Sequence, residues 1–250
     1  MGKLDGKVAI VTGSSRSMGK AIAIGLAKEG ADLVLAARGL EGLNATAAEI
    51  KALGRKALVV STDVMKESDI ENLFKKTMDE YGKLDILVNN SGIFNGGPID
   101  KMDTKAWDDV IATNLRAPFL CTRAALGIMK EHGGGKIINI GSISAQRPRQ
   151  NNAAYTTAKA GIVGLTMSTA LEGRDYGVTC SVLHPGETKR DRPPVPPANM
   201  PAGFTPPTRQ ETMDTEDIAA AAVYIASCPP YVNVLEMIQL PINQPYLGRG

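Results

Sequence analysis

Short apolar runs alternate along the chain with longer amphipathic segments. The runs are rich in Val, Ile and Leu and almost continuous in apolar character, as in parallel strands that helices cover on both faces. The expected strands are residues 7–11, 32–36, 57–61, 86–89, 136–140, 178–183 and 234–240. The expected helices are residues 18–29, 40–53, 67–81, 104–131, 155–176 and 215–227. This alternation predicts an α/β fold: one domain over residues 1–250, with a doubly wound seven-stranded parallel sheet.

One segment departs from this order. Seven prolines lie between Pro193 and Pro207, and they exclude a continuous helix or a central strand. The segment follows the sixth expected strand, at the edge of the sheet where α/β proteins bind ligands. Residues 190–213 are therefore interpreted as a substrate lid, and a surface excursion without a role is the alternative.

Composition and charge narrow the possible partners. Of 250 residues 43% are hydrophobic and 22% are charged, and the net charge is +2, which excludes a disordered chain and disfavours nucleic acid as a partner. The longest apolar stretch, Ile218 to Ala226, is about half of the ~20 residues that a membrane span needs. Three widely spaced cysteines suit reduced thiols in a cytoplasmic protein. We expect a small-molecule partner, without nucleic acid or membrane.

A glycine-containing turn follows the first expected strand and leads directly into a helix. It runs from Thr12 to Gly19 and reads T-G-S-S-R-S-M-G. Glycine lets the backbone turn tightly and approach a ligand closely, and the free N–H groups of a helix N-terminus favour an anion. A strand, this turn and a helix together predict a binding site for the pyrophosphate of a dinucleotide.

This turn resembles the T-G-x-x-x-G-x-G fingerprint of the short-chain dehydrogenase/reductase family, whose members have a Rossmann fold. Ser17 stands where the family has its middle glycine, so the loop is expected either to shift or to offer an extra hydrogen bond to phosphate. The resemblance implies cofactor contacts from six residues of the turn: Gly13, Ser15, Arg16, Ser17, Met18 and Gly19.

The charges next to the turn predict which dinucleotide binds. A carboxylate after the second strand would pair with a free ribose 2′-hydroxyl, whereas a 2′-phosphate requires cations. This chain has Arg38 there, and it has Arg16 in the turn. Two guanidinium groups that can bind one phosphate favour NADP(H).

The resemblance implies further cofactor contacts after later strands. Asp63 and Val64 match the family's adenine site, and Asn89 to Gly92 resembles its N-N-A-G motif. Asn89 could equally brace the sheet. The implied contacts are Asp63, Val64, Asn90, Ser91, Gly92, Pro185, Gly186 and Thr188.

Tyr155 and Lys159 are spaced to share one helix face about a turn apart. An ammonium beside a phenol stabilises the phenolate and thus lowers a pKa that is ordinarily near 10. The same spacing is also common in helical surface pairs.

Ser142 and Asn114 complete the catalytic set that the resemblance implies. In such enzymes Ser142 would bind the substrate carbonyl, Tyr155 would donate the proton, Lys159 would hold the nicotinamide ribose, and Asn114 would support a water relay. Taken singly, Ser142 could merely cap a turn and Asn114 could brace a helix kink.

The spacing of the histidines and cysteines disfavours a metal site. His132 and His184 are isolated, and no Cys/His cluster has metal-ligand intervals, so we expect no metal.

Arg147 and Arg149 follow Ser142; they could bind a substrate carboxylate or simply face solvent.

The sequence therefore predicts an NADP(H)-dependent oxidoreductase that interconverts a small ketone, aldehyde or keto acid with its alcohol or hydroxy acid. The general likeness is to 3-oxoacyl-[acyl-carrier-protein] reductases. A catalytically weak nucleotide-sensing protein is the alternative. The resemblance also implies a homotetramer.

Overall fold

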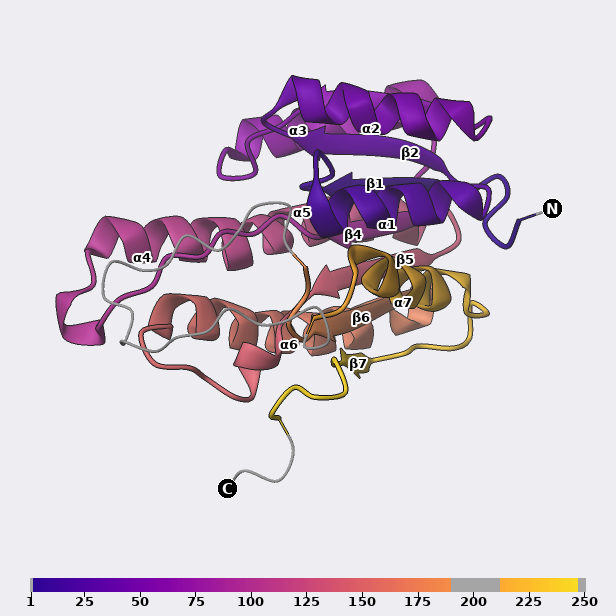
Figure 1. Cartoon of the computed structure of the whole chain (residues 1–250). Helices are drawn as coiled ribbons and strands as arrows, with labels where there is room; N and C mark the ends of the chain where they lie inside the picture. Colours follow the sequence, from indigo (N-terminus) through magenta and orange to yellow (C-terminus); the bar gives the residue numbers. More distant parts are fainter. Residues whose placement is uncertain (1, 190–211, 247–250) are drawn as a thin grey trace.

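Seven parallel strands form the sheet of the computed structural model, in the order β3-β2-β1-β4-β5-β6-β7 (Figure 1). The structure describes residues 2–189 and 212–246. The strands are Val8–Thr12 (β1), Asp32–Ala37 (β2), Ala57–Ser61 (β3), Ile86–Asn89 (β4), Gly135–Ile140 (β5), Val178–Pro185 (β6) and Glu236–Gln239 (β7). The doubly wound parallel sheet that the sequence predicts is confirmed.

Helices cover both faces of this sheet (Figure 1). They are Ser17–Lys28 (α1), Leu40–Ala52 (α2), Glu67–Tyr81 (α3), Thr104–Ile111 (α4), Ala117–Glu131 (α5), Ala153–Gly173 (α6) and Thr215–Ser227 (α7). Side chains of α1, α2 and α7 share one hydrophobic cluster, and those of α3 and α5 share the cluster on the opposite face.

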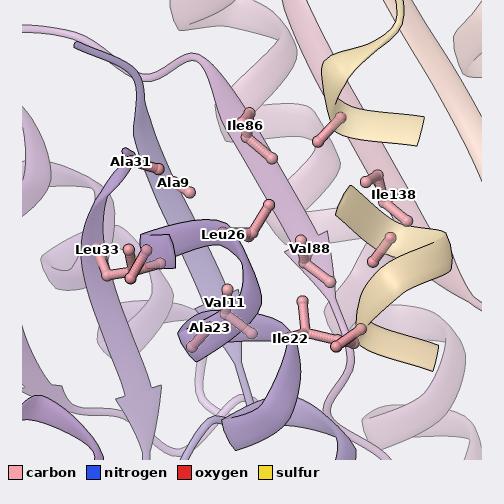
Figure 2. Close-up of a cluster of buried hydrophobic side chains, with 14 of the residues drawn as sticks. Ala9, Val11, Ile22, Ala23, Leu26, Ala31, Leu33, Ile86, Val88 and Ile138 are labelled. Atoms are coloured by element: carbon pink, nitrogen blue, oxygen red, sulfur yellow. The ribbon is translucent and has the colours of Figure 1, made fainter. Parts of the chain in front are cut away.

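The central strands are buried on both sides, which explains their continuous apolar runs. Every residue of β1 is buried. Ala9 and Val11 point to the α1 side, where Ile22 and Leu26 pack with them (Figure 2), whereas Val8 and Ile10 belong to the opposite cluster. At the edge, β7 alternates exposed and half-buried residues, and it is shorter than the predicted strand 234–240.

The helix predicted over residues 104–131 is interrupted, which corrects the sequence-based expectation. A π-helical turn at Ala112–Arg116 separates α4 from α5. Pro118 explains the break, because proline has no N–H and cannot donate to the carbonyl of Asn114 four residues earlier. The backbone resumes with a π-type hydrogen bond from the N–H of Ala117 to the carbonyl of Ala112.

The chain order of the strands reverses between β1 and β4, which lie side by side. At such a switch point the loops after the two strands separate and leave a crevice at their carboxyl ends. The fold thus predicts the ligand site beyond Thr12 and Asn89.

The predicted lid, residues 190–213, lies outside the described residues except for its last two.

Candidate active site

The turn after β1 has the backbone geometry that its glycines suggest. Gly13 has a positive φ of 69°, and a Cβ on Gly19 would lie 2.2 Å from the carbonyl oxygen of Gly13. Ser17, at the place of the family's middle glycine, has a positive φ of 50°. The loop therefore holds a left-handed residue at position 17 although serine adopts that conformation only at a cost.

The N-terminus of α1 is open to an anion. Its N-cap residue, Arg16, makes no side-chain capping hydrogen bond, and its first turn contains no acidic residue. The N–H groups of a helix N-terminus and the helix dipole together favour a phosphate there.

Two adjoining hollows lie at the carboxyl ends of the strands. One has a volume of about 760 Å³. It is lined by these predicted cofactor residues: Gly13, Ser15, Arg16, Ser17, Met18, Gly19, Arg38, Asp63, Val64, Asn90, Ser91 and Gly92. The other, of about 620 Å³, is lined by Pro185, Gly186 and Thr188 and by three predicted catalytic residues, Ser142, Tyr155 and Lys159. Arg16, Ser17, Met18, Asn90, Gly92 and Ile93 line both, so the two hollows form one continuous cleft.

Thr12 joins the two loops of the switch point. Its hydroxyl oxygen accepts hydrogen bonds from the backbone N–H groups of Asn90 (3.0 Å) and Ser91 (3.1 Å). The Asn90 amide in turn donates to the carbonyl of Thr12 at 2.9 Å. Sequence reasoning did not assign Thr12 a role; the signal was its place at the start of the fingerprint.

Asn89 braces the sheet, which was one of its two predicted roles. Its amide nitrogen donates to Asn139 Oδ1 at 2.8 Å and to Thr122 Oγ1 at 3.2 Å, and the residue is buried. It thus links β4, β5 and α5 beneath the cleft.

Ser142 begins the short 3-10 turn Ile143–Ala145 after β5, and its hydroxyl accepts a hydrogen bond from the N–H of Ser144 at 3.2 Å. The capping role is therefore present, and it coexists with a position on the wall of the cleft. A capped turn fixes the hydroxyl in place.

Tyr155 and Lys159 lie one turn apart on α6, as their spacing predicts. The Lys159 ammonium is 5.6 Å from the centroid of the Tyr155 ring, and it donates to the carbonyl of Ile140 at 2.6 Å. Lys159 is only 5% exposed, and this burial lowers its pKa to about 8. The two side chains thus meet at the end of β5 rather than diverging.

Asn114 lies in the π turn and is buried behind the cleft. Its side chain accepts from the N–H of Ile93 and donates to the carbonyl of Ile93, both at 2.8 Å. The amide therefore holds the loop after β4, and its own backbone carbonyl lacks an α-helical donor because residue 118 is proline.

The two arginines after Ser142 differ in their surroundings. Arg149 lines the cleft and is paired with Glu187 at 3.4 Å. Arg147 lies over the ring of Tyr246, 5.4 Å from its centroid. Each charge already has a partner of its own.

Three further features bear on expectations from the sequence: the cysteines, the metal-ligating groups and the apolar helices. Cys121, Cys180 and Cys228 are free thiols, and burial raises the pKa of Cys121 and of Cys180 to about 12. Across residues 2–189 and 212–246, no three His, Cys, Asp or Glu side chains are grouped as a metal site, and no helix is long and apolar enough to span a membrane.

Residues 7–192 match the family model of the short chain dehydrogenases. The chain is 38% identical over 187 residues to a 3-oxoacyl-[acyl-carrier-protein] reductase of Synechocystis sp., covering 74% of this chain and 76% of the relative. It is 37% identical over 183 residues to the (2S)-[(R)-hydroxy(phenyl)methyl]succinyl-CoA dehydrogenase subunit BbsD of Thauera aromatica, covering 73% of each. A metagenomic short-chain oxidoreductase, solved in complex with NADP, superposes with a TM-score of 0.83 at 33% identity over 97% of this chain and 100% of that one.

Fold, cleft and sequence matches agree on one class of enzyme. The chain belongs to the short-chain dehydrogenase/reductase family, and it is an oxidoreductase of that family.

Proposed function

We propose that the chain is an NADP(H)-dependent oxidoreductase that interconverts a small ketone or aldehyde with the corresponding alcohol. The observation that carries the proposal is that Ser142, Tyr155 and Lys159 line a hollow that continues into the phosphate-binding turn. The family membership and the NADP complex of the related structure also support it.

The residues present fit a phosphorylated dinucleotide. A Cβ on Gly19 would collide with the carbonyl of Gly13, so glycine keeps the turn packed against α1. The N-terminus of α1 beside this turn suits a pyrophosphate. Arg16 and Arg38 are exposed, line the same hollow, and form no ion pair in the part of the chain that the structure describes. Two free guanidinium groups support a 2′-phosphate and hence NADP(H).

Three side chains carry the proposed chemistry. A nicotinamide held in this cleft would supply or accept the hydride. Ser142 donates its hydroxyl proton in a hydrogen bond to the substrate carbonyl, and Tyr155 transfers its phenolic proton to the carbonyl oxygen. The charge of Lys159 stabilises the resulting phenolate. The backbone carbonyl of Asn114 has no α-helical donor and can therefore accept a hydrogen bond from a water. Such a water could return the proton to Tyr155.

The two arginines after Ser142 give little support for a keto acid as the substrate. Glu187 already balances the charge of Arg149 at the wall, and Arg147 lies against Tyr246. Phe94 adds an exposed apolar ring beside Tyr155. Two relatives are named for acyl substrates bound to a carrier protein or to CoA, and each matches about three quarters of this chain.

The test is turnover of NADPH, followed by its near-ultraviolet absorbance, with a panel of ketones, aldehydes and keto acids. Tyr155→Phe should lower kcat at least ~10²-fold, the usual contribution of general acid–base transfer, with NADPH affinity unchanged. Tyr231→Phe, at an 87% exposed position, is the control.

Two results would contradict the proposal. An unchanged kcat for Tyr155→Phe would remove the phenol from the mechanism. Tight NADPH binding without turnover on the whole panel would support the alternative of a nucleotide-sensing protein, for which Ser17 and Ser91 in the binding motifs are the favouring features.

The cytoplasmic location stays a prediction.

A further inference from the structure

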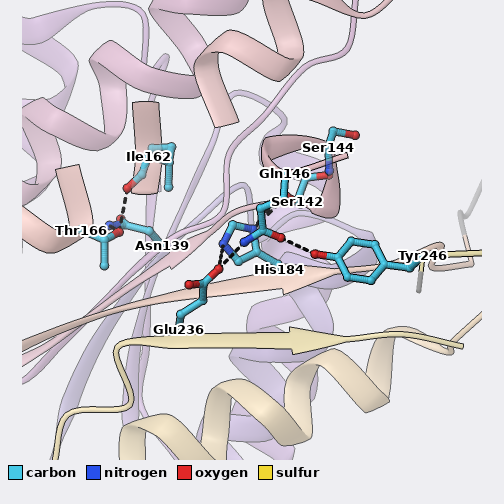
Figure 3. A network of polar contacts seen from close by, with 9 residues as sticks. All are labelled: Asn139, Ser142, Ser144, Gln146, Ile162, Thr166, His184, Glu236 and Tyr246. Carbon is cyan, nitrogen blue, oxygen red and sulfur yellow. Dashed lines mark hydrogen bonds and ion pairs between the residues drawn. The ribbon is translucent and has the colours of Figure 1, made fainter. Parts of the chain in front are cut away.

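A histidine that looked isolated in the sequence lies directly against the catalytic serine. His184, near the end of β6, is fully buried. Its Nδ1 is 3.0 Å from the backbone nitrogen of Ser142 and 2.8 Å from the carbonyl oxygen of the same residue (Figure 3). One ring nitrogen therefore faces both backbone groups of Ser142.

The position of this ring is fixed by the sheet. β5 and β6 are paired in register, and the N–H of Gly141 donates to the carbonyl of Leu183 at 2.7 Å. A Cβ on Gly141 would lie 2.5 Å from His184 Nδ1. Glycine before the catalytic serine therefore provides the space that the imidazole occupies.

The other side of the ring faces a carboxylate. His184 Nε2 lies 3.3 Å from Glu236 Oε1 on β7, an ion-pair distance without hydrogen-bond geometry. The same carboxylate oxygen accepts from the Gln146 amide, and Gln146 Oε1 accepts from the Tyr246 hydroxyl at 2.6 Å (Figure 3). The loop after Ser142, the edge strand and the C-terminal segment thus converge on Glu236.

Two charged groups and burial decide where the ring carries its proton. Glu236 faces Nε2 and favours a proton on that nitrogen, whereas the nearby Lys159 ammonium disfavours a second proton on the ring. Burial, the largest cause, lowers the pKa of His184. In the Nε2–H tautomer the lone pair of Nδ1 accepts from the N–H of Ser142, at the cost of facing the Ser142 carbonyl oxygen at 2.8 Å. In the Nδ1–H tautomer the ring would donate to that carbonyl, but its proton would oppose the Ser142 N–H and a bare Nε2 would face the Glu236 carboxylate.

We propose that His184, oriented by Glu236 in its Nε2–H tautomer, is a positioning residue that holds Ser142 by accepting a hydrogen bond from its backbone N–H. The proposal rests on the proposed function only for the role of the Ser142 hydroxyl. The tautomer and the contact are properties of the protein alone.

The tautomer can be read directly in the full chain. The protein has two histidines, so ¹⁵N-histidine labelling with the variant His132→Asn leaves a single imidazole, that of His184. The expected spectrum shows a bare Nδ1 and a protonated Nε2 at neutral pH. A protonated Nδ1, in either the other tautomer or the imidazolium, would overturn the proposal.

Kinetics test whether the contact matters. The Oδ1 atom of asparagine can occupy the place of Nδ1, so His184→Asn should keep kcat within about threefold of the wild type, whereas His184→Leu should lower kcat about 10- to 100-fold, as expected when a reacting group is misplaced. NADPH affinity should stay unchanged in both variants, because neither removes a proposed cofactor contact. His132→Asn, at an exposed site, is the matched control.

Glu236 gives a second route if His184→Leu does not fold. Glu236→Gln keeps an acceptor oxygen and should retain both the tautomer and kcat, whereas Glu236→Leu should shift the ring toward Nδ1–H and lower kcat about tenfold. Equal kcat for these two variants, or for His184→Leu and the wild type, would refute the positioning role. If the wild type itself turns over no substrate, the proposed function fails while the spectrum still tests the tautomer.

Discussion

The ammonium of Lys159 donates a hydrogen bond to the carbonyl oxygen of Ile140 at 2.6 Å. This contact anchors the lysine of α6 to the end of β5, directly before the loop that carries Ser142. Holding the charge there requires burying it, since Lys159 is 5% exposed. The site therefore destabilises its own lysine in the charged form, and that cost is measurable.

Lys159→Met should reveal this cost as a pH-dependent difference in stability. Burial lowers the pKa of Lys159 from 10.5 to about 8 in the folded protein. Between these values the unfolded chain binds more protons, so the free energy of unfolding of the wild type should rise with pH relative to the variant, by about 3 kcal/mol at most.

The measurement is urea unfolding of the cofactor-free protein from pH 7 to pH 10.5. Lys75→Met, which removes an exposed ammonium, is the control and should leave a constant difference from the wild type. A constant difference for Lys159→Met as well would contradict the prediction.

Ser17→Gly should stabilise the protein. The φ of 50° at Ser17 is favourable for glycine, and a left-handed conformation costs other residues roughly 1–2 kcal/mol. Glycine also gains freedom in the unfolded chain, so a net increase of about 0.5–1 kcal/mol in the free energy of unfolding is expected. Ser17→Ala retains the Cβ and should bring no such gain. Equal stability of the two variants by urea unfolding would show that backbone strain is not the cause.

The sequence predicts the parts of this fold that depend on local pattern. Continuous apolar runs located the buried strands, because both faces of a parallel sheet are covered. The interruption at residues 112–116 was missed, although Pro118 was visible in the sequence, because the periodicity of apolar residues continues through the π turn.

Contacts between distant segments were the part that sequence could not supply. His184 and Ser142 are separated by 42 positions, and only the pairing of β5 with β6 brings them together. Glu236 reaches the same place from an edge strand. The family resemblance provided residue roles, but it gave no reason to connect these three.

Arg38→Asp should shift the cofactor preference from NADPH toward NADH. Arg38 is exposed in the hollow with Arg16, and a hydrogen bond to a charged group contributes about 1.5–3 kcal/mol. The ratio of kcat/KM for the two cofactors should therefore change by about 10- to 100-fold or more, since the aspartate also repels a phosphate. Lys51→Asp changes the same charge on α2 outside the hollow and should leave the ratio unchanged. An unmoved ratio for Arg38→Asp would refute the role of Arg38.

Leu171→Asp should disrupt the homotetramer that the family resemblance implies. Phe119 on α5 and Met167 and Leu171 on α6 are large apolar side chains that are 46%, 48% and 62% exposed. A second copy of the chain packed there would bury them, and a carboxylate at its centre would oppose burial. Light scattering should give a tetramer for the wild type and a smaller species for Leu171→Asp. Leu53→Asp, after α2, is the control. A monomeric wild type at micromolar concentration would contradict the prediction.

Phe94→Ala should reduce the preference for substrates with an aromatic substituent. The Phe94 ring is 5.6 Å from that of Tyr155 in an edge-on arrangement, and it is 57% exposed on the wall of the 620 Å³ hollow. An aryl group on the substrate carbonyl could pack on the same ring, and such pairs contribute about 0.5–1.5 kcal/mol beyond the area that they bury.

We therefore expect kcat/KM for an aryl ketone to fall about tenfold in Phe94→Ala, with little change for a ketone that carries only methyl groups. Phe94→Leu retains apolar bulk without a ring and should lie between the two proteins. The comparison uses each ketone with saturating NADPH, so that a change in cofactor binding does not enter. If Phe94→Ala lowers kcat/KM equally for both ketones, the ring supports Tyr155 rather than selecting the substrate.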